Sequence, residues 1–202
     1  MSSITQRTFR LAAPYWLNSH HRAVGWALGL TLIAMVVVVT GLNYWLTGLQ
    51  KAFFDALEQH NGAAFRSAIT IFFVGVVALV ATVVSKAWLE QALEIRWRSH
   101  LTQTTLRRWL SGTTFYRIER DGTCDNPDQR LSEDVTEYTR LMIKLSLGFL
   151  GNLGTLGSMG WLLWKSAGPI SFELAGSAIT IPGYLFWVAI FWGVLQTIVT
   201  HL

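Results

Sequence analysis

Charged and uncharged residues are separated into long blocks along this chain. Four runs of 19 residues or more contain no Asp, Glu, Lys or Arg. A helix needs about 20 apolar residues to cross the roughly 30 Å hydrocarbon core of a bilayer. The runs are continuously apolar and do not alternate, which excludes transmembrane β-strands. We therefore predict four transmembrane helices, over about 24–47, 67–88, 145–165 and 182–202.

The second predicted helix continues beyond its apolar run. Leucines and a tryptophan recur at spacings of four and five after Lys86, a pattern close to that of a helix. We expect this helix to reach about residue 110. Ser111–Thr114 then breaks it, and a short turn follows over 111–126.

The third predicted helix begins well before its own apolar run. Asn126 is a good N-cap, Pro127 suits the first helical position and Asp128 favours the positive end of the helix dipole. Gln129 stands where a capping box places a residue that reaches back to the cap. We predict one helix from 127 to about 165, some 57 Å long at about 1.5 Å per residue.

These elements define the fold class. We predict an all-α integral membrane protein with four transmembrane helices, the second and third of which extend into the cytoplasm. The domain organisation is a cytoplasmic interfacial segment over 1–22 and a membrane domain over 23–202. The cytoplasmic extension of that domain spans 89–144.

The basic residues predict the orientation. Thirteen of the sixteen Lys and Arg residues lie before the first predicted span or between the second and third, and basic residues accumulate on the cytoplasmic side. Both ends of the chain are therefore expected in the cytoplasm. Because the net charge of +4 arises from this asymmetry, it gives no support to nucleic-acid binding.

Composition excludes two other classes of protein. The chain is 51% hydrophobic and only 14% charged, whereas soluble domains carry about 25% charged residues. The same figures exclude a disordered chain, which needs low hydrophobicity and high charge.

Three further segments give local predictions. Residues 5–18 resemble an interfacial helix, with a frayed tail as the alternative. Five glycines spaced by three in the third span permit close helix packing, with a gating role as the alternative. Residues 170–181 alternate as in strands and predict a small extracytoplasmic turn, after which Pro182 starts the fourth helix.

No motif for catalysis or metal binding stands out. The phosphate-binding pattern G-x-x-x-x-G-K-[ST], C-x-x-C and H-E-x-x-H are absent from the sequence, and the five histidines are scattered. We find no catalytic, cofactor-binding or metal site and do not expect this chain to be an enzyme by itself.

A polar string opens the third predicted helix: Asn126, Pro127, Asp128, Gln129, Arg130, Leu131, Ser132, Glu133, Asp134. Together with the weaker motifs Tyr15-Trp16, Trp45, 53–57, 96–98 and 101–102, this string resembles one group of ABC transporters. The group comprises the peroxisomal fatty-acyl half transporters and related bacterial ATP-binding/permease proteins, whose membrane part is the ABC transporter transmembrane region 2. The membrane region is also similar to the SbmA/BacA peptide transporters, which lack the ATPase domain.

The resemblance implies a mechanism and partners. Members of this group usually have six transmembrane helices, so the chain looks like the N-terminal portion of an exporter-like permease. The implied partners are membrane lipid, a second permease half in a homodimer, and an ATP-binding cassette that takes ATP and Mg²⁺ on the same or another chain. The implied location is the bacterial inner membrane. The residues expected to couple the cassette to transport are Asn126, Pro127, Asp128, Gln129, Arg130, Glu133 and Asp134, with simple helix capping as the alternative.

Three functions remain open from the sequence. The first is a permease part of an ABC transporter, which moves substrate by alternating access when ATP is hydrolysed. The second is a proton-coupled permease of the SbmA/BacA kind. The third is a membrane scaffold without transport activity.

Overall fold

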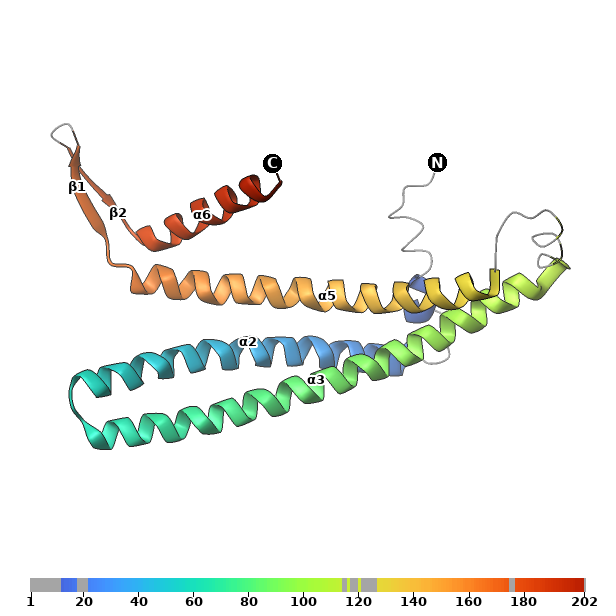
Figure 1. The fold of residues 1–202 in the computed structure, drawn as a ribbon, viewed down its shortest axis with the longest axis horizontal. Coiled ribbons are helices and arrows are strands. Elements are labelled where there is room, and N and C mark those ends of the chain that lie inside the picture. The colour runs from blue at the N-terminus through green and yellow to red at the C-terminus, as the bar shows by residue number, and fades with distance from the viewer. Residues whose placement is uncertain are drawn as a thin grey trace.

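The computed structural model describes residues 12–17, 22–113, 116, 120, 127–174 and 177–201. Four long helices dominate it, and a short β-hairpin joins the last two (Figure 1). The all-α fold class is confirmed for this part of the chain. The elements are α2 (Arg22–Glu58), α3 (Gly62–Leu110), the 3₁₀ turn η1 (Ser111–Thr113), α5 (Pro127–Ser166), β1 (Ile170–Leu174), β2 (Ser177–Ile181) and α6 (Tyr184–His201).

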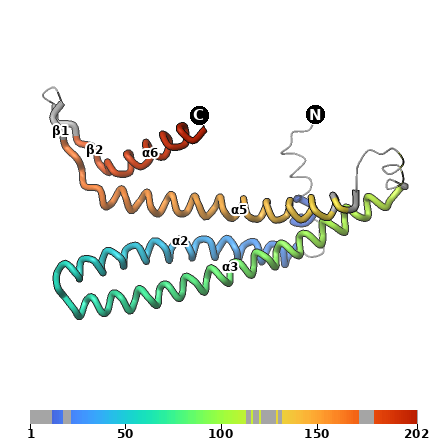
Figure 2. The backbone as a smooth tube through the Cα atoms, in the orientation of Figure 1, coloured from blue at the N-terminus to red at the C-terminus, as the bar shows by residue number. Residues whose placement is uncertain are grey.

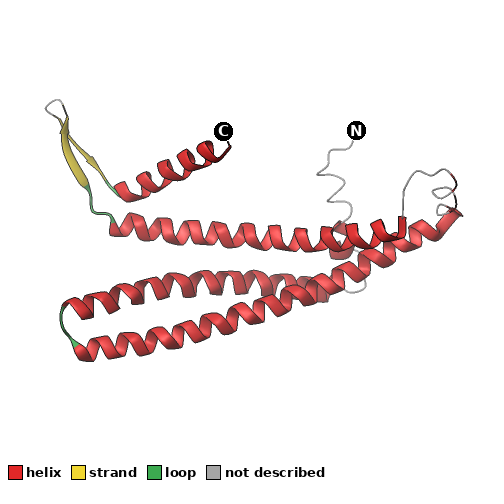
Figure 3. Cartoon of the chain, in the orientation of Figure 1, coloured by secondary structure: helices red, strands yellow, loops and turns green. Residues whose placement is uncertain are grey.

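The long helices form an elongated bundle. Helices α2 and α3 make an antiparallel hairpin, and α5 runs alongside both of them (Figure 2). Helix α6 turns back beside α5 and packs on that helix. The α2–α3 turn and the β-hairpin lie at one end of the bundle, while α3 ends and α5 begins at the other (Figure 3). This arrangement agrees with a chain that crosses a membrane several times.

Three of the described helices are long and apolar enough to span a membrane, namely α2, α3 and α6. The protein is a multi-pass membrane protein. Helix α5 contains the predicted third span without interruption, but glycines and Asn152 lower the mean hydropathy of that stretch. The crossing of α5 therefore stays a prediction.

The connection between α2 and α3 is much shorter than expected. The first two predicted spans leave about 48–66 between them, but α2 continues to Glu58 and α3 already begins at Gly62. Phe53 and Phe65 face each other with ring centroids 4.8 Å apart, which holds the extra turns together. The Asn61 side chain accepts a hydrogen bond from the Ala64 N–H and caps α3.

The two helix extensions at the other end are confirmed. Helix α3 ends at Leu110, and Gly112 in the following turn has a φ of 63°, a conformation that glycine adopts without strain. Helix α5 runs from Pro127 to Ser166. Most of the predicted turn over 111–126, with its Asn126 cap, lies outside the described residues.

The predicted strand character at 170–181 is also confirmed. Strands β1 and β2 pair antiparallel, with Ile170 opposite Ile181. The expectation that Pro182 starts the next helix is wrong, because Gly183 has a φ of 62° and α6 begins at Tyr184. A ring of Trp164 fills the space beside Gly183, where a Cβ atom would come within 2.5 Å of it.

The core lies where α2, α3 and α5 meet the N-terminal segment. Residues 12–17 are helical, and Tyr15 is completely enclosed by protein. The aromatic residues of this segment thus pack against the bundle; its location relative to a membrane leaflet stays a prediction. The buried core residues are Tyr15, Leu32, Val36, Leu93, Trp97, Leu101, Ile143 and Leu147.

The glycines of α5 face different neighbours. A Cβ atom would lie 3.7 Å from Val36 at Gly151 and 3.1 Å from the Thr40 hydroxyl at Gly154, so both glycines bring α5 close to α2. Gly160 instead faces Phe186 of α6. Residues spaced by three turn gradually around a helix that has about 3.6 residues per turn. The glycines therefore allow close packing of α5 against α2 on one face and against α6 on another.

Candidate functional site

A polar cavity of about 660 Å³ lies among α2, α3 and α5. Its volume falls within the range of small-molecule sites, roughly 300–1,000 Å³. Charged and amide side chains of α3 line one wall and those of α5 another, while α2 contributes no charge. The polar lining consists of Thr40 and Asn43 on α2, Lys86, Glu90, Gln91 and Glu94 on α3, and Arg140, Lys144, Asn152 and Thr155 on α5.

The α3 wall carries an ion pair. The Nζ atom of Lys86 lies 2.7 Å from Oε1 of Glu90, and both side chains are about two-thirds or more covered, with exposed fractions of 26% and 31%. Residues four apart lie on one helix face, so Lys86, Glu90 and Glu94 form a single row along the cavity. Ionisable groups within membrane spans are rare and usually serve a function, and Lys86 stands at the edge of the charge-free stretch of α3.

The α5 wall is basic. Arg140 and Lys144 are also four residues apart and line the same cavity. The Nε atom of Arg140 lies 3.5 Å from Oε2 of Glu137, in a pair whose two side chains are more than half exposed. Such an exposed pair neutralises little of the positive charge.

Beyond these charges the cavity reaches the charge-free stretches of α2 and α5. Asn43 donates from Nδ2 to the Val39 carbonyl at 2.9 Å, and Thr40 donates to the Val36 carbonyl at 3.0 Å. Asn152 and Thr155 supply further polar groups from α5. The site can therefore accommodate a ligand that combines charged, polar and apolar parts.

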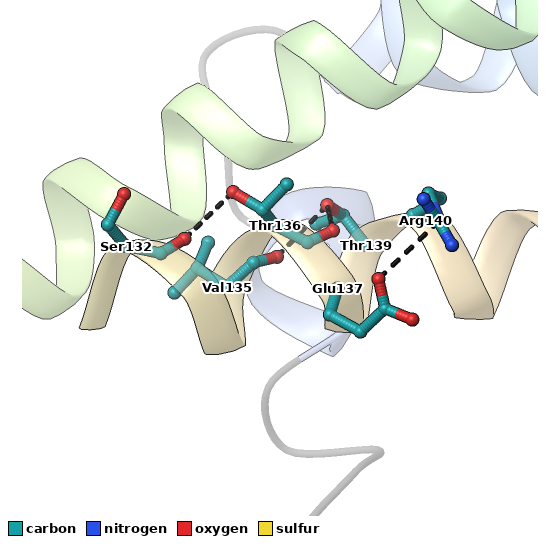
Figure 4. A network of polar contacts seen from close by, with 6 residues as sticks. All are labelled: Ser132, Val135, Thr136, Glu137, Thr139 and Arg140. Carbon is teal, nitrogen blue, oxygen red and sulfur yellow. Dashed lines mark hydrogen bonds and ion pairs between the residues drawn. The ribbon is translucent and has the colours of Figure 1, made fainter. Parts of the chain in front are cut away.

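Intrahelical hydrogen bonds order the N-terminal part of α5 (Figure 4). The Thr136 hydroxyl donates to the Ser132 carbonyl at 2.8 Å. The hydroxyl of Thr139, which is fully buried, lies 3.0 Å from the carbonyl oxygens of both Val135 and Thr136. Because its hydroxyl is satisfied within α5, Thr139 can be buried beside the apolar core without leaving an unpaired donor.

The residues expected to act in coupling lie on the first turns of α5, away from the cavity. Glu133 and Asp134 are exposed, and Gln129 donates from Nε2 to Oε1 of Glu133 at 2.8 Å. Pro127, Asp128 and Arg130 belong to the helix, but their side chains are not among those described. Asn126 also lies outside the described residues, so its capping role stays a prediction.

Aromatic residues fix the N-terminal segment to the same part of the bundle. The ring of Tyr15 stacks on Trp97 with centroids 5.9 Å apart, and Trp26 donates from Nε1 to the Trp16 carbonyl at 3.0 Å. Burial raises the pKa of the Tyr15 phenol above its ordinary value, and the positive charge of Arg96 offsets part of that effect. Burial also raises the pKa of Tyr138.

Sequence reasoning did not identify the cavity. Its signal was nevertheless present, because acidic residues recur every four positions on α3 and basic residues every four positions on α5. Sequence position alone places Glu90, Glu94, Arg140 and Lys144 in the predicted cytoplasmic extension over 89–144. The missing information was which helix faces meet, and this depends on the packing of three helices.

The family described as ABC transporter transmembrane region 2 matches residues 15–201. This chain belongs to that family. The family resemblance inferred from the sequence motifs is confirmed, whereas the relation to the SbmA/BacA transporters stays an expectation.

Proteins from bacteria, plants and humans are similar to the chain. It is 32% identical over 196 residues to the inner membrane ABC transporter ATP-binding protein YddA of Escherichia coli K12, covering 95% of this chain and 34% of YddA. It is 25% identical over 147 residues to the chloroplastic ABC transporter D family member 2 of Arabidopsis thaliana, covering 73% of this chain and 21% of that protein. The human lysosomal cobalamin transporter ABCD4 is 26% identical over 122 residues, which cover 58% of this chain and 20% of ABCD4. The chain thus spans about a third or less of the length of these relatives.

Proposed function

We propose that this chain forms part of the membrane-spanning permease of an ABC transporter. The observation that carries the proposal is the polar cavity among α2, α3 and α5, a site of suitable volume at the border of the charge-free stretches. Family membership supports the same function. The chain would then provide a binding and translocation surface and would not itself catalyse a reaction.

ATP hydrolysis would be supplied from outside this chain. The sequence contains no P-loop, and ATP and Mg²⁺ would therefore bind to a cassette on another part of the complete protein or on another chain. The first turns of α5, with exposed Glu133 and Asp134, provide a polar surface for docking of that cassette. Movement of the α3 and α5 ends would switch the cavity between the two sides of the membrane by alternating access.

The location and assembly follow the same proposal. The chain would lie in a bacterial inner membrane with both of its ends in the cytoplasm, as the distribution of thirteen basic residues against three supports. A second permease half, in a homodimer, would complete the transport path.

A proton-coupled permease is the second candidate. It is favoured by one observation, the Lys86–Glu90 ion pair in the wall of the cavity, because paired ionisable groups in membrane proteins often mark a pathway for ions or protons. In that case a proton gradient, instead of ATP hydrolysis, would switch the cavity between the two sides of the membrane.

Distance measurements in the complete transporter test the proposal. Spin labels attached after Arg108→Cys and Ser132→Cys report the separation of the ends of α3 and α5. Cys124→Ser removes the thiol of this chain, and any other cysteine of the complete transporter is replaced as well. We expect the distance to change between the nucleotide-free and vanadate-trapped states in lipid nanodiscs. Labels at Ser85→Cys and Arg108→Cys lie on one helix and serve as the control pair that should not change.

The outcomes separate the candidates. A change of distance with ATP and vanadate supports the ATP-driven permease. A change that follows pH but not nucleotide supports the proton-coupled permease. A constant distance under both conditions would contradict alternating access and leave the scaffold function.

A further inference from the structure

The polar cavity has walls of opposite charge. On α3, the carboxylates of Glu90 and Glu94 lie one helical turn apart. On α5, the side chains of Arg140 and Lys144 have the same spacing. The third wall, on α2, contains no charged residue among those that line the cavity.

Only some of these charges are neutralised within the protein. Lys86 pairs with Glu90, and Arg140 has an exposed partner in Glu137. Among the described residues, Glu94 and Lys144 have no ion-pair partner within 4.0 Å. The cavity therefore offers one acid without an ion-pair partner, Glu94, on the α3 wall. On the α5 wall it offers Lys144, also without a partner, beside Arg140, whose exposed pair neutralises little of its charge.

Apolar side chains also line the cavity. Val36 and Val39 of α2 belong to its lining, together with Leu147 of α5. Val36 and Leu147 are also part of the buried core, so this surface is held in place. A ligand that fills the cavity therefore meets apolar surface as well as both charged walls.

We infer that this cavity binds a zwitterionic solute whose two charged groups are joined by an apolar segment. Glu94 pairs with the cationic group, Lys144 with Arg140 beside it pairs with the anionic group, and the apolar segment lies on Val36 and Val39. The inference names the substrate class for the cavity of the proposed permease and rests on that proposal.

Charge balance makes the site selective. Glu94 is half-buried and Lys144 is exposed in the free protein. A ligand with a single charge covers the opposite wall and removes water from its charged group without supplying a partner. A zwitterion compensates both walls at once. Selectivity then comes from the penalty on singly charged ligands as much as from attraction of the right one.

Three probes of equal chain length test the inference by direct binding. The probes are ω-aminooctanoate, which is zwitterionic, octanoate, which is only anionic, and octylamine, which is only cationic. Binding to the full chain in lipid nanodiscs is measured by calorimetry, with empty nanodiscs as the blank. We expect the zwitterion to bind about tenfold more tightly than either singly charged probe.

Charge-removing variants assign each contact. Glu94→Gln should abolish the advantage of ω-aminooctanoate over octanoate, and Lys144→Gln should abolish its advantage over octylamine. Glu58→Gln and Arg66→Gln remove an acid and a base near the α2–α3 turn, outside the cavity, and should leave the preference unchanged. Circular dichroism confirms that each variant keeps its helix content.

The source of the zwitterion is distinguished by lipid composition. Nanodiscs of phosphatidylethanolamine present a zwitterionic head group, and those of phosphatidylglycerol do not. Weaker binding of ω-aminooctanoate in phosphatidylethanolamine indicates that lipid competes for the site, and equal binding indicates a water-soluble ligand. Equal affinity for the three probes, or no binding above the blank, overturns the inference. The permease function is tested separately by the nucleotide-dependent change of distance between the spin labels on α3 and α5.

Discussion

Gly75 of α3 lies directly against Trp45 of α2. A Cβ atom at Gly75 would come within 2.7 Å of the indole ring and within 2.8 Å of the Leu46 side chain. Distances this short allow no side chain at position 75 unless α2 and α3 separate or the two side chains move. The contact therefore sets how closely the two helices approach near the middle of their hairpin.

The first prediction concerns this helix contact. Gly75→Leu should destabilise the protein by about 1–3 kcal/mol, because a larger side chain overpacks the α2–α3 contact. Gly48→Leu is the matched control, since a Cβ atom at Gly48 meets nothing within 4 Å. Thermal unfolding in detergent measures both variants, and equal midpoints would contradict the packing that the structure shows.

Much of the fold was predictable because a bilayer imposes simple rules. Charge-free runs of sufficient length locate helices. The turn signal at Ser111–Thr114 correctly predicts where α3 ends, and the signal at Asn126–Pro127 correctly predicts where α5 begins. The alternation of apolar and polar residues around Thr180 also predicts the β-hairpin. These signals are local, and they do not depend on how the helices pack.

What the sequence did not reveal depends on tertiary contacts. The sequence predicts an interfacial helix over 5–18 but no packing partner for Tyr15, whose ring lies between Trp16 and Trp97. A tryptophan or tyrosine near a span end has the same sequence signature whether it faces lipid or protein. Likewise, the length of α2 beyond residue 47 depends on the contact between Phe53 and Phe65, which no local pattern predicts.

The second prediction concerns pH. Burial raises the pKa of Tyr15 and Tyr138 above the ordinary value of 10.0, so the folded state favours the neutral phenols. The stabilisation is complete below pH 10 and is lost as the pH rises through the folded-state pKa values. We expect the loss of stability above pH 10 to be smaller in the double variant Tyr15→Phe/Tyr138→Phe. Chemical unfolding across this range tests it, with Tyr116→Phe, which changes an exposed ring, expected to behave like the unmodified chain.

The third prediction concerns topology. The α2–α3 turn and the β-hairpin lie at the same end of the bundle, so they should reach the same side of the membrane (Figure 1). Alkaline phosphatase, which is active only in the periplasm, should be active when fused after residue 60 or 169 and inactive after residue 110 or 202. Strong phosphatase activity of the fusion at residue 202, with none at residue 60, would show that the orientation is opposite to the predicted one.

The fourth prediction separates coupling from capping at the start of α5. If this segment only caps the helix, Asn126→Ala should cost about 1 kcal/mol of helix stability, and charge removal nearby should leave transport intact. If it also transmits movement from a cassette, Arg130→Ala or Asp134→Ala should reduce transport to background while membrane insertion and expression stay normal. Loss of transport in properly inserted protein assigns the charge to coupling, since folding is then unaffected.

Transport and ATP hydrolysis must be measured side by side in the reconstituted, complete transporter. A coupling defect should lower substrate uptake far more than the ATPase rate, because the cassette can still bind and hydrolyse ATP. Ser132→Ala is the matched control, since Ser132 is exposed on the same turns and carries no charge. Normal uptake by both charge-removal variants would refute coupling and leave the capping role, in which the exposed charges only favour the start of α5.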